Sequence, residues 1–128
     1  QYQGLNTVPG IGNILSLVIM LETGDITRFK KSGNYTSYSR CVGSICISNG
    51  KKKGSNNKKN GNKFLSWAYH EAAMGTKRWN EKANSYYQRK LARGSSVLAT
   101  RSLAAKLTKS CYYIMRDQEV FQEKLIFG

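Results

Sequence analysis

The chain has 128 residues, with 21 lysines and arginines against 7 acidic residues and a formal charge of +14 at pH 7. This length fits one ordinary domain and excludes a second catalytic domain beside it, so we expect residues 1–128 to form one unit. Such a charge predicts a polyanionic partner, with nucleic acid as the leading class. The apolar stretch from Ile14 to Leu21 is far shorter than the roughly 20 residues of a membrane span. We therefore expect no membrane partner.

The start of the chain and its cysteines indicate where the protein works. Gln1 is not an initiator methionine and no signal-peptide pattern follows it, so we expect a fragment from inside a longer protein. Cys41, Cys46 and Cys111 are an odd, scattered set, which argues against a disulfide framework and fits a reducing cytoplasm. With His70 as the sole histidine, we expect no zinc site.

The motif Pro9-Gly10-Ile11-Gly12 predicts a tight turn that leads into a helix over the following apolar residues. Gly10 and Gly12 allow the first free amides of that helix to face a phosphate. The pattern resembles the turn of a helix-hairpin-helix element, a sequence-independent binder of the DNA backbone, whose first helix would lie mostly before Gln1. The alternative is an ordinary glycine-rich turn that starts a buried helix.

Short polar motifs predict where the next elements end and begin. Gly24 should end the first helix, and Asp25 should cap a short turn that runs through Phe29. We expect a second helix from Tyr35 to Val42, preceded by Ser32-Gly33-Asn34 as a breaker and capping group. Residues 45–47 then predict a short extended segment.

Residues Ser48 to Lys63 contain six lysines, three glycines and no apolar side chain, which predicts an exposed basic loop over residues 44–63. Ammonium groups attract phosphates, and Ser48 offers a hydroxyl that can attack phosphorus once its proton is removed. The alternative is a solvated basic linker. The candidate DNA-binding lysines of this loop are Lys51, Lys52, Lys53, Lys58 and Lys59.

After the loop, helical periodicity predicts three helices within residues 61–127. The first runs from Gly61 or Asn62 to about Lys77, and its positive end adds to the field of the lysine loop. The second spans Glu81 to Ala92 and ends at Gly94. Ser95-Ser96 should cap the third, which we expect to pack on the helix that contains Trp67. Its apolar stripe consists of Leu103, Leu107, Cys111 and Ile114.

Several side chains in this half have two interpretations. We expect His70 to be structural, because no carboxylate at catalytic spacing accompanies it. Tyrosines can stack on bases, but at helical spacing they usually pack against other helices; they are Tyr86, Tyr87, Tyr112 and Tyr113. The residues from Asp117 onward suggest a docking tail. Together these elements predict an all-α fold of four to six helices with one long basic loop.

Four motifs in order carry a family resemblance: Pro9-Gly10-Ile11-Gly12, Ser48-Asn49-Gly50-Lys51, the stretch from Lys59 to Leu65, and Glu71-Ala72-Ala73. Over roughly residues 5–115 they resemble the C-terminal domain of the insertion sequence 110/116/902 transposases. The resemblance implies that a RuvC-like domain, missing from this chain, holds Mg²⁺ on acidic residues. It also implies a structured guide RNA encoded by the element and a place in the bacterial cytoplasm, close to the nucleoid. We expect a homo-oligomer of the full-length protein.

The resemblance places the family's catalytic serine on Ser48, with Ser55 as the rival position. Lys51, Lys59 and Asn62 fall on polar positions that would hold the scissile backbone. The predicted function is DNA cleavage and strand transfer through a phosphoserine. We expect no cofactor in this fragment, and the fragment alone should be inactive. The alternatives are a non-enzymatic DNA- or RNA-binding module of helix-hairpin-helix type and a small ribosomal-type structural protein.

Overall fold

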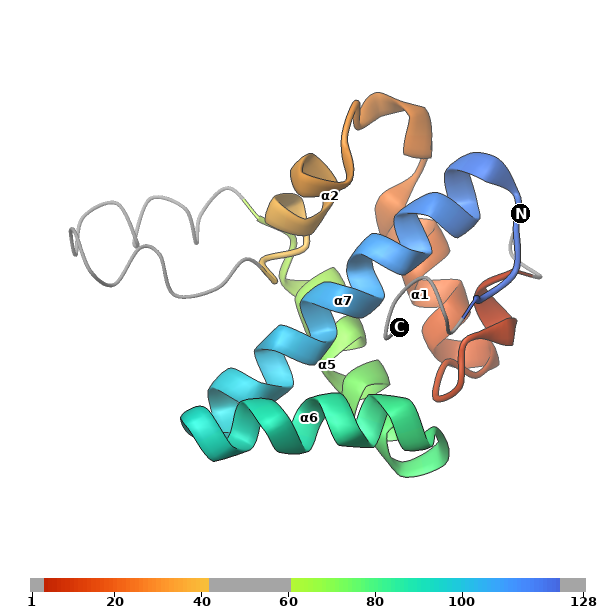
Figure 1. Cartoon of the computed structure of the whole chain (residues 1–128). Helices are drawn as coiled ribbons and strands as arrows, with labels where there is room; N and C mark the ends of the chain where they lie inside the picture. Colours follow the sequence, from red (N-terminus) through yellow and green to blue (C-terminus); the bar gives the residue numbers. More distant parts are fainter. Residues whose placement is uncertain (1–3, 42–60, 123–128) are drawn as a thin grey trace, which may run out of the picture.

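The computed structural model describes residues 4–41 and 61–122, and these residues form helices and connecting turns without a strand (Figure 1). The predicted all-α fold is confirmed for this part of the chain. In order, the elements are the 3-10 helix η1 (Leu5–Thr7), α1 (Asn13–Thr23), the 3-10 helix η2 (Ile26–Arg28), α2 (Ser32–Tyr38), α5 (Lys63–Trp79), α6 (Glu81–Arg93) and α7 (Ser96–Asp117).

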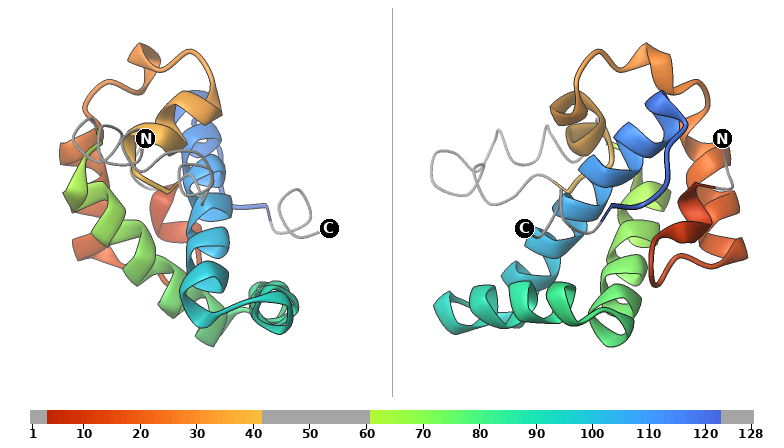
Figure 2. Two further views of the ribbon diagram at one scale, coloured as in Figure 1. Left: turned by 90° about the vertical axis from the view of Figure 1, so that its left-hand side faces the viewer. Right: turned by 45° about the vertical axis from the view of Figure 1, so that its right-hand side comes forward.

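Helix α7 is the central element of the fold. Its 22 residues pack against α2, α5 and α6, and α6 lies across the end of α7 where the two are joined (Figures 1 and 2). The predicted packing of α7 on the helix that contains Trp67 is confirmed, because α5 and α7 share an extensive contact. All four residues of the predicted stripe are buried, namely Leu103, Leu107, Cys111 and Ile114.

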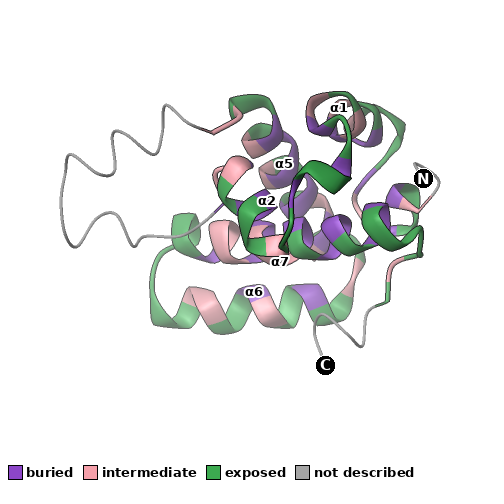
Figure 3. Ribbon diagram, turned by 90° about the horizontal axis from the view of Figure 1, so that it is seen from above, coloured by how far each residue is buried: buried purple, intermediate pink, exposed green. Residues whose placement is uncertain are grey.

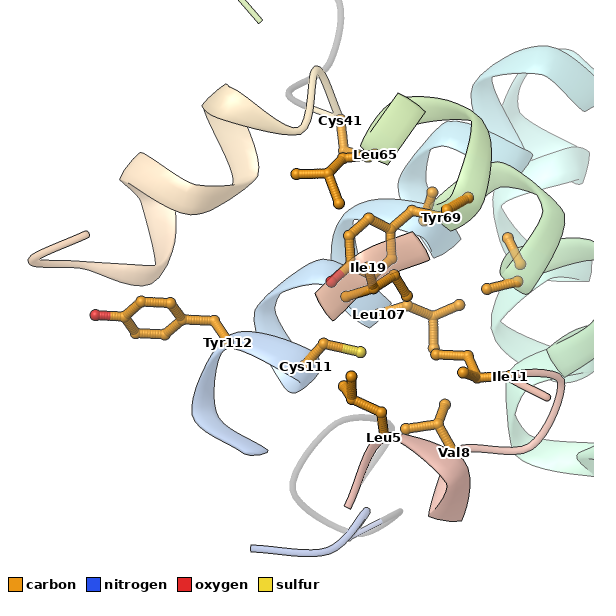
Figure 4. Close-up of a cluster of buried hydrophobic side chains, with 14 of the residues drawn as sticks. Leu5, Val8, Ile11, Ile19, Cys41, Leu65, Tyr69, Leu107, Cys111 and Tyr112 are labelled. Carbon is orange, nitrogen blue, oxygen red and sulfur yellow. The ribbon is translucent and has the colours of Figure 1, made fainter. Parts of the chain in front are cut away.

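The core joins residues from both ends of the described chain. Leu5, Val8 and Ile11 of the N-terminal turn meet Ile19 of α1 and Leu107 of α7 in one buried cluster (Figure 4). Figure 3 shows that the buried residues of the helices lie on the sides that face one another, whereas the outer sides are exposed. Burial of this apolar surface is the main stabilising term of the fold.

Hydrogen bonds of four buried hydroxyl groups link α1, α2, α5 and α7 to one another or to the turn between α1 and α2. The Tyr35 hydroxyl of α2 lies 2.7 Å from Thr23 Oγ1 of α1 and 2.8 Å from the Tyr69 hydroxyl of α5. Tyr112 of α7 donates its hydroxyl to the carbonyl of Phe29 at 2.7 Å. Each of these four hydroxyls therefore has a partner, which avoids the cost of an unpaired polar group.

Most helix ends lie where the capping residues predicted them. Gly24 follows α1 with φ of 67°, and Asp25 accepts from the Thr27 amide at 3.0 Å at the start of η2. Ser95 caps α7 by accepting from Leu98 N, and Gly94 ends α6. Helix α5 starts at Lys63 with Asn62 as its cap, within one residue of the predicted start.

The predicted bounds of α2 were wrong at both ends. The helix begins at Ser32, so Ser32-Gly33-Asn34 is its first turn and not a breaker. It ends at Tyr38 and not at Val42, because Arg40 adopts a left-handed conformation with φ of 59°. The amide of Cys41 donates to Thr36 O at 3.1 Å and that of Arg40 to Ser37 O at 3.0 Å. This is the hydrogen-bond pattern of a Schellman motif, which turns the chain out of the helix.

The residues after α7 return to the N-terminal turn. The Phe121 amide donates to Thr7 Oγ1 at 2.7 Å, and the Phe121 side chain packs against the core. The predicted tail therefore docks on its own domain, as far as the structure describes it.

Candidate nucleic-acid interface

The two ends of the basic segment 42–60 leave the folded domain at one place. The Asn62 amide donates to the carbonyl of Tyr38 at 2.7 Å, so the start of α5 is tied to the end of α2. Gly61 lies against the Arg40 side chain, where any Cβ would overlap Arg40 Cγ. We call Tyr38, Arg40, Gly61 and Asn62 the neck. The neck fixes both ends of a segment that carries five of the candidate lysines.

The Asn62 side chain holds the neck together. Its Oδ1 accepts from the amides of Phe64 and Leu65, both at 2.9 Å, which caps α5. Its Nδ2 donates to Glu22 Oε1 of α1 at 2.9 Å and to the Tyr38 hydroxyl at 3.3 Å. Both ends of this amide are thus engaged within the domain. Contact between Asn62 and DNA stays a prediction, whereas its positioning role is visible.

An arginine that the sequence patterns did not single out completes this region. The Arg28 guanidinium donates twice to Thr23 O, at 3.0 and 3.1 Å. Its Cζ lies 4.5 Å from the ring centroid of Phe29 and 4.8 Å from that of Tyr38. The hydrogen bond from Asn62, followed by the contact with Arg28, lowers the pKa of Tyr38. An exposed, fixed cation therefore lies beside the neck, and only its place in a basic stretch hints at it in the sequence.

Most candidate site residues lie outside the described residues. These are the proposed nucleophile Ser48, its rival Ser55, the extended segment 45–47 and the lysines Lys51, Lys52, Lys53, Lys58 and Lys59. Their roles stay predictions.

The two glycines of the turn differ in their surroundings: Gly10 is packed against α5, and Gly12 faces open space. Gly10 has φ of 95°, and a Cβ there would lie 2.4 Å from the backbone nitrogen of Thr76 in α5. Gly12 is exposed, no atom lies within 4 Å of where its Cβ would be, and it precedes α1 without a side-chain cap. The first turn of α1 can therefore be approached by an anion at Gly12. Before the turn, the described chain forms only η1, so a helix-hairpin-helix pair stays a prediction.

Other candidates have structural roles. His70 Nδ1 is hydrogen bonded to Ser66 O at 2.7 Å within α5. Tyr112 and Tyr87 are buried, which confirms their packing role, while Tyr86 and Tyr113 stay partly exposed. Cys41 and Cys111 are free and buried, and burial raises the pKa of their thiols to about 11 and about 12.

The described residues do not fit a magnesium site. No three histidine, cysteine or acidic side chains come together in residues 4–41 and 61–122. Among the acids, Glu22 accepts from Asn62 and Asp117 pairs with Arg116 at 2.9 Å. No helix in this part of the chain is long and apolar enough to cross a bilayer.

A comparison with protein families shows which family the chain belongs to. The model of the Transposase IS116/IS110/IS902 family matches residues 2–88, about two thirds of the sequence. The chain belongs to this transposase family. The match spans the glycine turn, the neck, the segment 42–60 and most of α6, whereas α7 lies beyond it. No curated protein and no solved structure matched the chain. A transposase acts on DNA, so the family supports DNA as a partner.

Proposed function

We propose that this domain cleaves and transfers DNA strands during transposition, with Ser48 as the nucleophile. The observation that carries the proposal is the neck, which holds both ends of the serine-bearing basic segment at one point in a chain of a transposase family. Such an anchor keeps Ser48 near the folded domain, because seven residues after Cys41 it lies at most about 25 Å from that residue whatever path the chain takes.

In the proposed step, Ser48 Oγ forms a bond to a backbone phosphorus and the bond from phosphorus to the 3′ oxygen breaks. The electron pair of that bond stays on the 3′ oxygen, which takes up the proton that the serine gives away. The products are a phosphoserine joined to the 5′ end and a free 3′ hydroxyl. In the second step, a 3′ hydroxyl attacks the phosphoserine, which restores Ser48 and joins a new strand.

The lysines supply the electrostatic part of the mechanism. Negative charge builds on the transferring phosphoryl group, and Lys51, Lys52, Lys53, Lys58 and Lys59 would neutralise it. Arg28 beside the neck and the exposed start of α1 at Gly12 would extend this positive field over a longer stretch of strand. Gly10 would act by shaping the turn.

The other parts of the machinery are proposed from the family. A RuvC-like domain outside this chain would hold Mg²⁺ on acidic residues. A guide RNA would select the DNA, and copies of the full-length protein would assemble on it. The isolated chain would therefore bind nucleic acid without cutting it.

A non-enzymatic binding module is the second candidate, favoured by the exposed Gly12 at the uncapped start of α1. The two functions differ in their need for Ser48. Replacing Ser48 with alanine in the full-length protein should abolish the covalent adduct on a nicked suicide substrate while DNA affinity is retained. Ser55→Ala is the matched control and should form the adduct. An adduct with both variants would show that neither serine is the nucleophile, and it would favour a binding role for this domain within the full-length protein.

A further inference from the structure

A basic cleft lies between α6 and α7, apart from the glycine turn. Its volume is about 320 Å³, at the lower end of the range for ligand-binding pockets. Tyr86 of α6 forms one wall, α7 the other, and Cys41 also lines it. None of its described lining residues is acidic, and three are cationic: Arg101, Lys106 and Lys109.

One donor in this cleft is buried and unused. Arg101 Nε is inaccessible to solvent and has no hydrogen-bond partner among the described residues. Buried polar atoms are nearly always paired, and an orphan donor on a permanently charged group indicates a missing acceptor. The neighbouring Cys41 thiol does not neutralise Arg101, because burial raises its pKa to about 11 and keeps it protonated near neutral pH.

Further cations gather around the Tyr86 ring. Lys106 Nζ lies 5.5 Å from its centroid, Lys90 Nζ also 5.5 Å, and Arg89 Cζ 5.7 Å. Cations that crowd one ring repel each other, and a bound anion would relieve this repulsion. Helices α6 and α7 thus present a second positive surface. Its α7 residues lie beyond the residues that match the family model.

The cleft adjoins the point where the chain enters the basic segment. Cys41 lines the cleft and is the last described residue before residue 42. Ser48 follows seven residues later in the sequence, so it lies at most about 25 Å from Cys41 whatever path the chain takes. A strand held in the cleft is therefore within a few nucleotides of the proposed nucleophile.

We propose that the α6–α7 cleft binds a backbone phosphate of a single-stranded nucleic acid, with the Arg101 guanidinium as its principal donor and Lys106 and Lys109 as further cations of the lining. The cleft is too small for a duplex. The Arg101 side chain lines the cleft and is only partly buried, so a rotation that turns its guanidinium toward the opening would give the unpaired Nε–H a phosphate oxygen as its acceptor. This inference deepens the proposed function, but its test measures binding alone. Binding in the cleft can be disproved while the Ser48 adduct still forms, and the adduct can be absent while the cleft still binds a strand.

The test uses the 128-residue chain and labelled single-stranded DNA and RNA of one sequence, titrated at several salt concentrations. Arg101→Gln should weaken binding roughly tenfold and reduce the salt slope by about 0.7, as expected for one lost phosphate contact. Arg78→Gln is the control, since it removes the same charge from an exposed position at the end of α5. It should weaken binding less than about threefold.

The outcomes separate the possibilities. A loss with DNA alone, RNA alone or both supports the cleft and identifies its strand. Equal losses for Arg101→Gln and Arg78→Gln would overturn it, because binding would then depend on total charge. If Arg101→Gln does not fold, the same comparison is made with Lys106→Gln as the test variant and Lys30→Gln, at an exposed position away from the cleft lining, as its control. In wild type, the Arg101 Nε–H resonance should shift when the strand is added, and an unchanged resonance would also overturn the proposal.

Discussion

The backbone amide of Asn62 and the carbonyl of Tyr38 are joined by a hydrogen bond of 2.7 Å, although the whole segment 42–60 lies between them. This bond and the Asn62 side chain close the neck. Closing a long loop costs conformational entropy, and residues 48–60 of this loop have no apolar side chain whose burial could offset that cost. The domain therefore fixes the loop at its base through polar contacts of one asparagine.

Replacing Asn62 with alanine should destabilise the domain by about 1 to 3 kcal/mol, because the variant loses the cap of α5 and the contacts with Glu22 and Tyr38. Urea unfolding measures this loss. Asn62→Ser keeps an acceptor for the cap and lacks the amide donor, so it should lose about half as much. Equal stabilities of Asn62→Ala and wild type would show that the neck does not hold the fold.

Tyr35→Phe should cost about 1 to 3 kcal/mol in the free energy of unfolding, because it leaves the buried hydroxyls of Thr23 and Tyr69 without their shared partner. Tyr113→Phe makes the same chemical change at an exposed position of α7 and should stay within about 0.5 kcal/mol of wild type. Thermal unfolding of the pair compares them. Similar losses in both variants would contradict the buried network.

Gly10→Ala should destabilise the domain by about 2 kcal/mol or more, since a Cβ would meet the α5 backbone and the left-handed φ of 95° disfavours alanine. Gly12→Ala is the matched control and should change stability by less than about 1 kcal/mol, because its Cβ has open space. A larger loss of stability for Gly12→Ala than for Gly10→Ala would contradict the close packing of Gly10 on α5.

The buried thiols predict a loss of stability in alkaline solution. Burial raises the pKa of Cys111 from 9.0 to about 12, so between these values the unfolded chain releases a proton that the folded chain keeps. The contribution of this thiol is present below about pH 9 and falls as the pH rises towards 12. Urea unfolding at about pH 8 and about pH 10 should show a larger drop for wild type than for Cys111→Ala. Equal drops would exclude a thiol contribution.

The helices were predictable because their signals are local. The apolar spacing of Leu103 and Leu107 and the caps at Gly24 and Ser95 lie within single elements, and the structure confirms them. The bounds of α2 were not predictable from such local signals. The burial of Tyr35 outweighs the low helix propensity of Ser32-Gly33-Asn34, which form the first turn of the helix. Its end depends on Arg40 in a conformation that usually selects glycine.

The site was predictable only in part, for a similar reason. The lysine-rich composition of the loop and the likeness of Ser48 to the family serine can be read from the sequence. The neck and the unpaired Arg101 donor depend on contacts between residues that are distant in the chain, which no local pattern encodes. Asn62 illustrates the difference, since its predicted role was a DNA contact and its visible role is to cap α5 and hold the neck.

The most direct test of the central claim is mass spectrometry of the covalent adduct that full-length protein forms on a suicide substrate. Trypsin cleaves after lysine and arginine, so Ser48 falls in the peptide 41–51 and Ser55 in the peptide 54–58. After nuclease treatment, the phosphate remnant should lie on the peptide 41–51, and fragmentation should place it on Ser48 and not on Ser44. A remnant on the peptide 54–58, or none on either peptide, would contradict the proposal that Ser48 is the nucleophile.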